Sequence, residues 1–336
     1  MRNEKIDFLR FIGLSMIILA HVKPPEILFQ LRNFDVPLMV IVSGMSFGLV
    51  FREEPYLHYV WKRVKRLVFP VWIFLTLYLG ACWAFDIPVA NLSFIAKSYL
   101  LVGGIEYLWI IRVFLFIALI APLIAVLNRR VHSNKKYLAI LGVFLLIYEV
   151  AKYSILPYAD EGIGKGVYLL VSYVCPYLFL FALGLRIPNL KAKTNHQLIV
   201  ISLAIFISLS AFLAFHAGEF VDTQKYKYPP SIYYLSYAVF VTVLLWHVSE
   251  PLWDFVKENT GVRNLVLFVA QNSIWLYLWH IPLIEAVQKN FATKYLLIYA
   301  ISILITYIQT SLVIFVLLPR VSSNSIKKNL KLLLTG

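Results

Sequence analysis

Ten long apolar runs constrain this chain more than any other feature of its sequence. A helix needs about 20 mostly apolar residues to cross the hydrocarbon core of a bilayer. The runs that meet this need lie near residues 6–23, 34–51, 67–85, 107–127, 137–156, 166–185, 197–215, 231–248, 265–287 and 295–318. The sequence therefore predicts an all-α integral membrane protein, a bundle of about ten transmembrane helices. The shorter run 92–102 predicts an interfacial or re-entrant segment.

The composition excludes an ordinary soluble fold. Hydrophobic residues make up 61% of the 336 residues and charged residues only 14%, which is more apolar surface than a soluble domain of this size can bury. The lipid bilayer is therefore the expected solvent. The net charge of +14 comes from basic residues that cluster between apolar runs, as in cytoplasmic loops. We expect no nucleic-acid partner.

The basic clusters also predict the orientation of the chain. Basic residues near helix ends stay on the cytoplasmic side, and the richest clusters share one side when both termini are cytoplasmic. These clusters lie within residues 52–66, 129–136, 186–193 and 320–331. We expect a multi-pass protein of the cytoplasmic (inner) membrane, with one transmembrane domain over residues 1–320 and a short basic cytoplasmic tail over 321–336.

Two ionisable residues share one face of the first predicted helix. Eleven steps of about 100° separate Arg10 from His21, only about 20° more than three full turns, and the two lie about 16 Å apart along the axis. Ionisable groups within a membrane helix usually face the protein interior or a water-filled cavity. We expect Arg10 near the cytoplasmic entrance and His21 toward the far side.

Further motifs follow in order along the chain. Segment 36–45 ends in Ser43 and Gly44, a basic loop carries Arg63 and Arg66 before a proline, and segment 272–284 contains His280 among aromatic residues. With the pair in the first helix, these motifs resemble those of the acyltransferase-3 membrane proteins, which O-acylate surface polysaccharides and other exported molecules. The resemblance covers nearly the whole chain.

The resemblance implies a membrane O-acyltransferase. It would move an acyl group, expected to be acetyl, from cytoplasmic acyl-CoA to a hydroxyl of a cell-surface or exported carbohydrate or glycolipid. Acyl-CoA would be the donor substrate, with no bound cofactor. The chain departs from the family near the fourth helix, where many relatives have a histidine and this chain has Glu106 to Trp109 followed by Arg112. We expect no fused esterase-like domain.

The two histidines and Asp35 are candidates for proton transfer. Imidazole titrates near neutrality, so His21 is the candidate general base for the acceptor hydroxyl. A covalent acyl-histidine is an alternative, and so is a purely structural hydrogen bond at the helix end. Asp35 could orient His21 or be a solvated loop acid. His280 could be a second catalytic or acceptor-binding group, or a structural one.

The arginines are candidates for donor binding. Arg10 could hold phosphates or polarise the thioester carbonyl, or be an interfacial anchor. Arg63 and Arg66, one turn apart, could clamp the phosphates of coenzyme A, although such clusters are often only topological. Ser43 could donate a hydrogen bond in an acyl channel or serve packing. Arg112 stays open as a substrate contact.

Three further expectations concern the remaining polar residues. Glu149 and Lys152 stand three residues apart within a span and can neutralise each other. The remaining histidines lack ligand spacing, so we propose no metal site. Two other functions fit the same inward charges: a transporter or flippase of a polar or glycan-linked solute, and a structural component of a glycan assembly machine.

Overall fold

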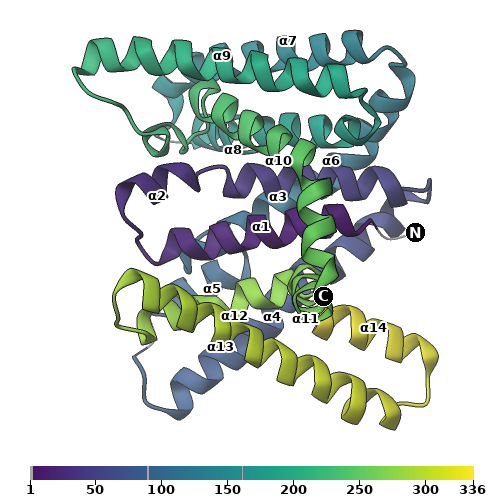
Figure 1. The fold of residues 1–336 in the computed structure, drawn as a ribbon. Helices are drawn as coiled ribbons and strands as arrows, with labels where there is room; N and C mark the ends of the chain where they lie inside the picture. Colours follow the sequence, from purple (N-terminus) through teal and green to yellow (C-terminus); the bar gives the residue numbers. More distant parts are fainter. Residues whose placement is uncertain (1–2, 89–90, 161) are drawn as a thin grey trace. The chain divides into compact units, whose positions relative to one another are not determined.

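The computed structural model is all α-helical. It describes residues 3–88, 91–160 and 162–336, and these ranges contain no β-strand (Figure 1). The longer helices are α1 (Glu4–His21), α3 (Asp35–Val50), α4 (Tyr56–Ala84), α6 (Trp109–Arg130), α7 (Asn134–Ile155), α8 (Gly162–Arg186), α9 (Ala192–Ala217), α10 (Ile232–Glu258), α11 (Thr260–Gln271), α12 (Ser273–Ala286), α13 (Phe291–Ser311) and α14 (Asn324–Thr335). Short helical segments connect them: α2 (Glu26–Leu31), α5 (Leu92–Tyr99), η1 (Glu106–Leu108), η2 (Leu156–Tyr158), η3 (Ile187–Asn189), η4 (Thr223–Tyr226), η5 (Leu312–Leu317) and η6 (Leu318–Arg320).

Eight helical stretches in the described residues are long and apolar enough to cross a membrane. They are Glu26–Val50, Tyr56–Ala84, Glu106–Arg130, Asn134–Tyr158, Gly162–Asn189, Ala192–Ala217, Ile232–Glu258 and Phe291–Arg320, and each overlaps one predicted segment. A ninth is possible when α11 and α12 count as one broken span. The first predicted segment forms α1, whose N-terminal half is rich in charge. The chain is a multi-pass membrane protein, while the total of ten spans and the orientation of the termini stay predictions.

Several helices begin or end where the sequence supplies a cap. The side chains of Asn91, Ser133 and Asn290 accept hydrogen bonds from backbone N–H groups at the starts of α5, α7 and α13. These bonds satisfy donors that the first turn of a helix cannot pair internally. Gly218 ends α9 in the left-handed region with a φ of 75°, a conformation that glycine adopts without steric cost.

The chain packs as two compact units. The first contains residues 3–20, 25–52 and 120–263, apart from residue 161. Within it α3 packs along α8 at very close range. A Cβ on Gly44 would lie 2.2 Å from the Phe181 carbonyl oxygen, and one on Gly184 would lie 2.2 Å from the Ile41 oxygen. Gly44, next to Ser43, and Gly184 on α8 therefore serve helix packing.

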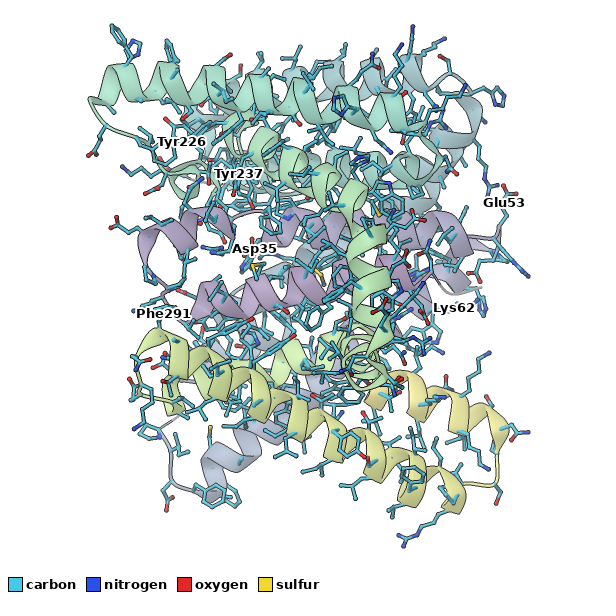
Figure 2. All side chains as sticks on the ribbon, viewed as in Figure 1. Asp35, Glu53, Lys62, Tyr226, Tyr237 and Phe291 are labelled. Carbon is cyan, nitrogen blue, oxygen red and sulfur yellow. The ribbon has the colours of Figure 1, made fainter. Side chains whose placement is uncertain are left out.

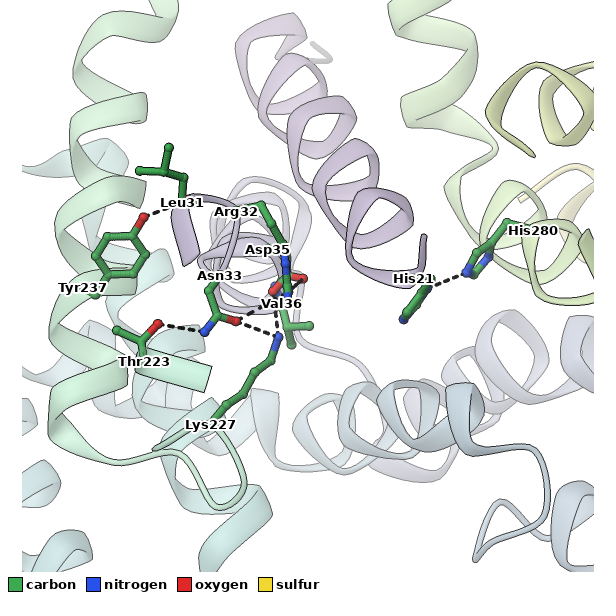
Figure 3. Close-up of polar contacts among 10 residues, drawn as sticks. All are labelled: His21, Leu31, Arg32, Asn33, Asp35, Val36, Thr223, Lys227, Tyr237 and His280. Carbon is green, nitrogen blue, oxygen red and sulfur yellow. Dashed lines mark hydrogen bonds and ion pairs between the residues drawn. The ribbon is translucent and has the colours of Figure 1, made fainter. Parts of the chain in front are cut away.

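A cluster of three buried charged residues joins α3 to the turn before α10. Asp35 accepts hydrogen bonds from Arg32 at 2.8 Å and from Lys227 at 3.0 Å (Figure 3). All three side chains are almost completely buried. Burial lowers the pKa of Lys227 from its ordinary value, although the Asp35 carboxylate opposes this shift. We call Arg32, Asp35 and Lys227 the interior charge cluster.

The second unit contains residues 21–24, 53–119 apart from 89 and 90, and 264–336. Here α12 packs against α4 and α13, and α14 packs against α4 and α13. The helices α11 and α12 meet at a bend of 83°. Asn272 forms the bend with a φ of −104° and a ψ of 23°, and its side-chain amide donates to the Phe268 carbonyl at 2.8 Å. The single straight segment predicted over 265–287 is thus two helices.

The interior charge cluster generates a prediction about stability. Replacing Asp35 by Asn leaves Arg32 and Lys227 as two buried cations without an anion, and such a loss costs about 3–5 kcal/mol. We expect Asp35→Asn to lower the thermal unfolding midpoint of the purified protein in detergent, measured by intrinsic tryptophan fluorescence. The same substitution in the exposed pair of Asp254 with Lys257 should leave the midpoint unchanged. Equal midpoints for the two variants would contradict this account.

Candidate active site

Two histidines meet in the second unit. The His21 Nδ1 atom, in the last residue of α1, lies 2.8 Å from the Nε2 atom of His280 on α12 (Figure 3). The two rings are nearly parallel, with centroids 5.0 Å apart. His280 is completely buried and His21 is half-buried. The arrangement brings together two of the residues that the sequence singled out, which are 259 positions apart.

The partners of the histidine pair define which nitrogen carries each proton. The Nδ1 atom of His280 is hydrogen-bonded to the Tyr277 carbonyl oxygen, which can only accept, so this Nδ1 carries a hydrogen. In a neutral imidazole the Nε2 atom then has the lone pair, and it accepts from Nδ1–H of His21. By this assignment the lone pair of neutral His21 is on its Nε2 atom. That atom is the one able to take up a proton.

Aromatic side chains surround the pair. The Tyr107 ring stands edge-on to His21, with centroids 4.6 Å apart, and also contacts His280. The Tyr277 hydroxyl donates to the Tyr107 carbonyl oxygen, which ties α12 to the segment before α6. Apolar rings around an imidazole exclude water and restrict its orientation. Tyr107 occupies the stretch where the sequence lacks the histidine found in many relatives.

Arg10 lies earlier on α1, in the first unit. Its guanidinium donates to the Asp7 carboxylate at 2.7 Å and to the Ser46 hydroxyl at 2.7 Å. Because α1 is one continuous helix from Glu4 to His21, the predicted helical spacing between Arg10 and His21 is retained. The ion pair with Asp7 offsets the cost of an arginine inside a membrane helix. A contact of Arg10 with the donor stays a prediction.

Arg63 and Arg66 lie in the first turns of α4, in the second unit. Arg66 is exposed and Arg63 is half-buried, with its guanidinium 4.8 Å from the centre of the Tyr59 ring. Such a contact fixes the direction of a guanidinium without consuming its charge. Side chains three positions apart on one helix can reach the same anion. The role of Arg63 and Arg66 as a phosphate clamp stays a prediction.

The other candidates have more varied surroundings. Asp35 directs its carboxylate to the interior charge cluster, so it is a buried ion-pair residue and no solvated loop acid. Ser43 is half-buried in the α3 segment that packs on α8. Arg112 is half-buried in the first turn of α6, and it has no hydrogen-bond or ion-pair partner among the described residues. The substrate roles of these three residues stay predictions.

Three contacts of the site were not predicted from the sequence. Tyr107 contacts His21, whereas residues 106–109 were considered from the sequence only because they lack the histidine of many relatives. Tyr277 was part of an aromatic motif with no separate role, and Ser46 was not considered beside Ser43. Ser46 lies about one turn beyond Ser43 on α3, and helical periodicity from Arg10 alone could not have selected it. In contrast, the predicted pair of Glu149 with Lys152 is confirmed at 2.6 Å.

The described residues contain no group of three or more histidine, cysteine, aspartate or glutamate side chains that could hold a metal ion. No curated protein and no solved structure matches the chain. The family model described as an acyltransferase domain matches residues 3–318, which include the helices that carry both histidines. The chain is therefore a membrane acyltransferase of the acyltransferase-3 family.

Proposed function

We propose that this protein is an O-acyltransferase of the cytoplasmic membrane. The donor is acyl-CoA from the cytoplasm, with acetyl as the expected acyl group, and the acceptor is a hydroxyl of a cell-surface or exported carbohydrate or glycolipid. The observation that carries this proposal is the hydrogen bond from His21 to His280, because it orients the His21 ring and leaves the lone pair of the neutral ring on Nε2. Family membership favours acyl transfer over solute transport.

In the proposed reaction His21 acts as the general base. Its Nε2 atom takes the proton of the acceptor hydroxyl as the hydroxyl oxygen attacks the thioester carbonyl carbon. The tetrahedral intermediate collapses by breaking the carbon–sulfur bond, which releases the coenzyme A thiolate and forms the oxygen ester. The protonated His21 then returns its proton to the thiolate, so the products are the ester and the free thiol.

His280 is the positioning residue in this mechanism. It contacts neither substrate, but its Nε2 atom accepts the Nδ1 hydrogen of His21 and so fixes both the tautomer and the ring orientation. The Tyr277 carbonyl fixes His280 in turn. Complete burial of His280 favours its neutral form, which is the form that can accept this hydrogen bond.

The donor would bind through its phosphates on α4. The planar guanidinium groups of Arg63 and Arg66 suit bidentate contacts with phosphate oxygens. Both residues belong to the second unit, as do both histidines. The pantetheine arm of coenzyme A would extend from the phosphate site along the helices of this unit toward His21.

The first prediction concerns the general base. His21→Ala removes the group that accepts the hydroxyl proton, so we expect acyl transfer to fall by about 10²–10⁴-fold. Inverted membrane vesicles that carry each variant are incubated with radiolabelled acetyl-CoA, and the label in alkali-labile esters of the glycan and lipid fractions is counted. His216→Ala, at the exposed end of α9, is the matched control and should label as wild type. Undiminished labelling by His21→Ala would exclude the mechanism.

The second prediction concerns His280. His280→Ala removes one hydrogen bond to His21, worth about 0.5–1.5 kcal/mol, so we expect up to about a tenfold lower kcat with an unchanged KM for the donor. His280→Gln keeps a carbonyl oxygen that can accept from His21 and should recover part of the loss. Equal loss in both variants, with a parallel fall in thermal stability, would assign His280 a structural role only.

The acceptor can be identified directly. Mass spectrometry compares the glycans and glycolipids of cells that contain the wild-type protein with those of cells that contain His21→Ala. A mass difference that mild alkali removes would identify both the acyl group and the molecule that carries it. Identical glycans and glycolipids in the two strains would speak against a carbohydrate acceptor.

A further inference from the structure

The last helix of the chain carries a dense and uncompensated positive charge. In α14 the basic residues are Lys327, Lys328 and Lys331, and the segment from 286 to 336 contains no acidic residue. Spacings of three and four residues place the lysines on one side of the helix. Lys328 and Lys331 are exposed. From its sequence this segment was expected only to be a basic tail.

Side-chain contacts hold α14 in place within the second unit. Its start is capped by Ser323. Near its end, the Trp275 indole N–H donates to the Leu333 carbonyl at 3.1 Å and the Gln309 amide donates to the Leu334 carbonyl at 2.7 Å. Carbonyls in the last turn of a helix have no internal partner, so these two donors stabilise the helix end. Helix α14 is thus a docked element and no loose tail.

The docking brings α14 to the basic turns of α4. The Lys65 ammonium donates to the Asn329 side chain at 3.3 Å, which makes the two helices neighbours. The basic residues that they contribute are Lys62, Arg63, Lys65, Arg66, Lys327, Lys328 and Lys331. The nearest acids in the sequence are Glu53 and Glu54 before α4, and Glu54 is paired with Lys62 at 2.5 Å. Figure 2 labels Lys62 on α4 and Glu53 in the segment before this helix.

This excess of positive charge favours the binding of a polyanion. Like charges on two adjoining helices repel, and the repulsion favours binding of a ligand with several negative groups. Phosphate oxygens suit both the forked guanidinium groups and the ammonium groups of this surface. Two sources of phosphate are available to a membrane protein: the donor nucleotide and the headgroups of anionic lipids.

We propose that α14 and the first turns of α4 form one polyphosphate-binding surface, in which Lys328 and Lys331 complete the site for the diphosphate and ribose phosphate of coenzyme A. This inference rests on the proposed function, because it assumes an acyl-CoA donor. The two arginines on α4 favour the nucleotide over a lipid, since they offer bidentate contacts to phosphate groups whose spacing is fixed within one molecule. The family match ends at residue 318, before α14 begins.

The test compares two charge-matched double variants of the full-length protein. Lys328→Gln with Lys331→Gln removes two cations from the proposed surface. Lys97→Gln with Lys289→Gln removes two exposed cations elsewhere in the same unit. Binding of coenzyme A to each purified protein in detergent is measured by isothermal titration calorimetry. We expect the α14 variant to bind about tenfold more weakly, since each exposed ion pair contributes modestly, and the control to bind as wild type.

Two further measurements test whether the defect of the α14 variant lies in phosphate binding. Turnover of acetyl-pantetheine, which lacks the phosphates, should be equal in wild type and in the α14 variant. The difference in coenzyme A affinity should shrink as salt is raised, because ions screen exposed charges. Unequal turnover of acetyl-pantetheine would overturn the proposal by showing a general defect.

The lipid source is tested in the same proteins. Binding to vesicles of phosphatidylglycerol is compared with binding to vesicles of phosphatidylcholine. If the α14 variant binds coenzyme A as wild type does and loses only its preference for phosphatidylglycerol, the surface belongs to lipid headgroups and this inference is wrong while the proposed function stands. If the wild type itself binds no coenzyme A, the proposed function fails first.

Discussion

Several polar contacts in this protein follow from one constraint: inside a bilayer, a charge or an unpaired N–H group has no water to bind, so a partner within the chain stabilises it. Lys152 therefore pairs with Glu149, and the carboxylate of Glu149 also accepts from the backbone of α10. At the end of α8, in a basic cluster predicted to be cytoplasmic, the buried Arg186 is paired as well: it donates to the backbone carbonyls at the end of α6 and in the turn that follows it. The bond to Glu149 ties α10 to α7, and the bonds of Arg186 tie α8 to the end of α6.

The same constraint gives the histidine pair its chemical character. A buried imidazole cannot leave both nitrogens without partners, so the Tyr277 carbonyl fixes one nitrogen of His280 and His21 occupies the other. The chain of bonds has a direction, because a carbonyl can only accept. His21 therefore donates through Nδ1 to His280, and the Nε2 atom of neutral His21 keeps its lone pair. A structural need of the membrane interior thus fixes the tautomer and the orientation of the base that the proposed transfer reaction requires.

Local features of the fold could be predicted from the sequence, and distant pairings could not. Eight predicted segments coincide with helices long and apolar enough to cross a membrane, because a run of apolar residues is itself the physical requirement for crossing a bilayer. The bend at Asn272 was missed, since one asparagine among apolar residues leaves the run intact. His21 and His280 were both selected as candidates, but nothing in their spacing indicates that their rings meet, because the contact depends on the tertiary packing within the second unit.

The C-terminal tail illustrates a signal that was present in the sequence. Ile326, Leu330 and Leu333 recur at the spacing of one helical face, opposite the lysines, and this pattern predicts an amphipathic helix at an interface. Only the basic residues of this segment were used in its prediction from the sequence, as an indication that it lies on the cytoplasmic side. Its docking partners could still not have been named, because Lys65 lies 264 positions away from Asn329 and nothing in the sequence marks Gln309 as the residue that meets the end of α14.

Gln309 links the docking of α14 to the position of the histidine pair. Its amide oxygen accepts from the Trp279 indole at 2.7 Å, while its amide nitrogen donates to the Leu334 carbonyl of α14. Only one orientation of the Gln309 amide satisfies both partners. In the flipped orientation the amide nitrogen would face the Trp279 N–H, which is also a donor, and the amide oxygen would face the Leu334 carbonyl, which is also an acceptor. Trp279 directly precedes His280 on α12. The bonds that anchor α14 therefore also restrain the helix that orients the proposed base.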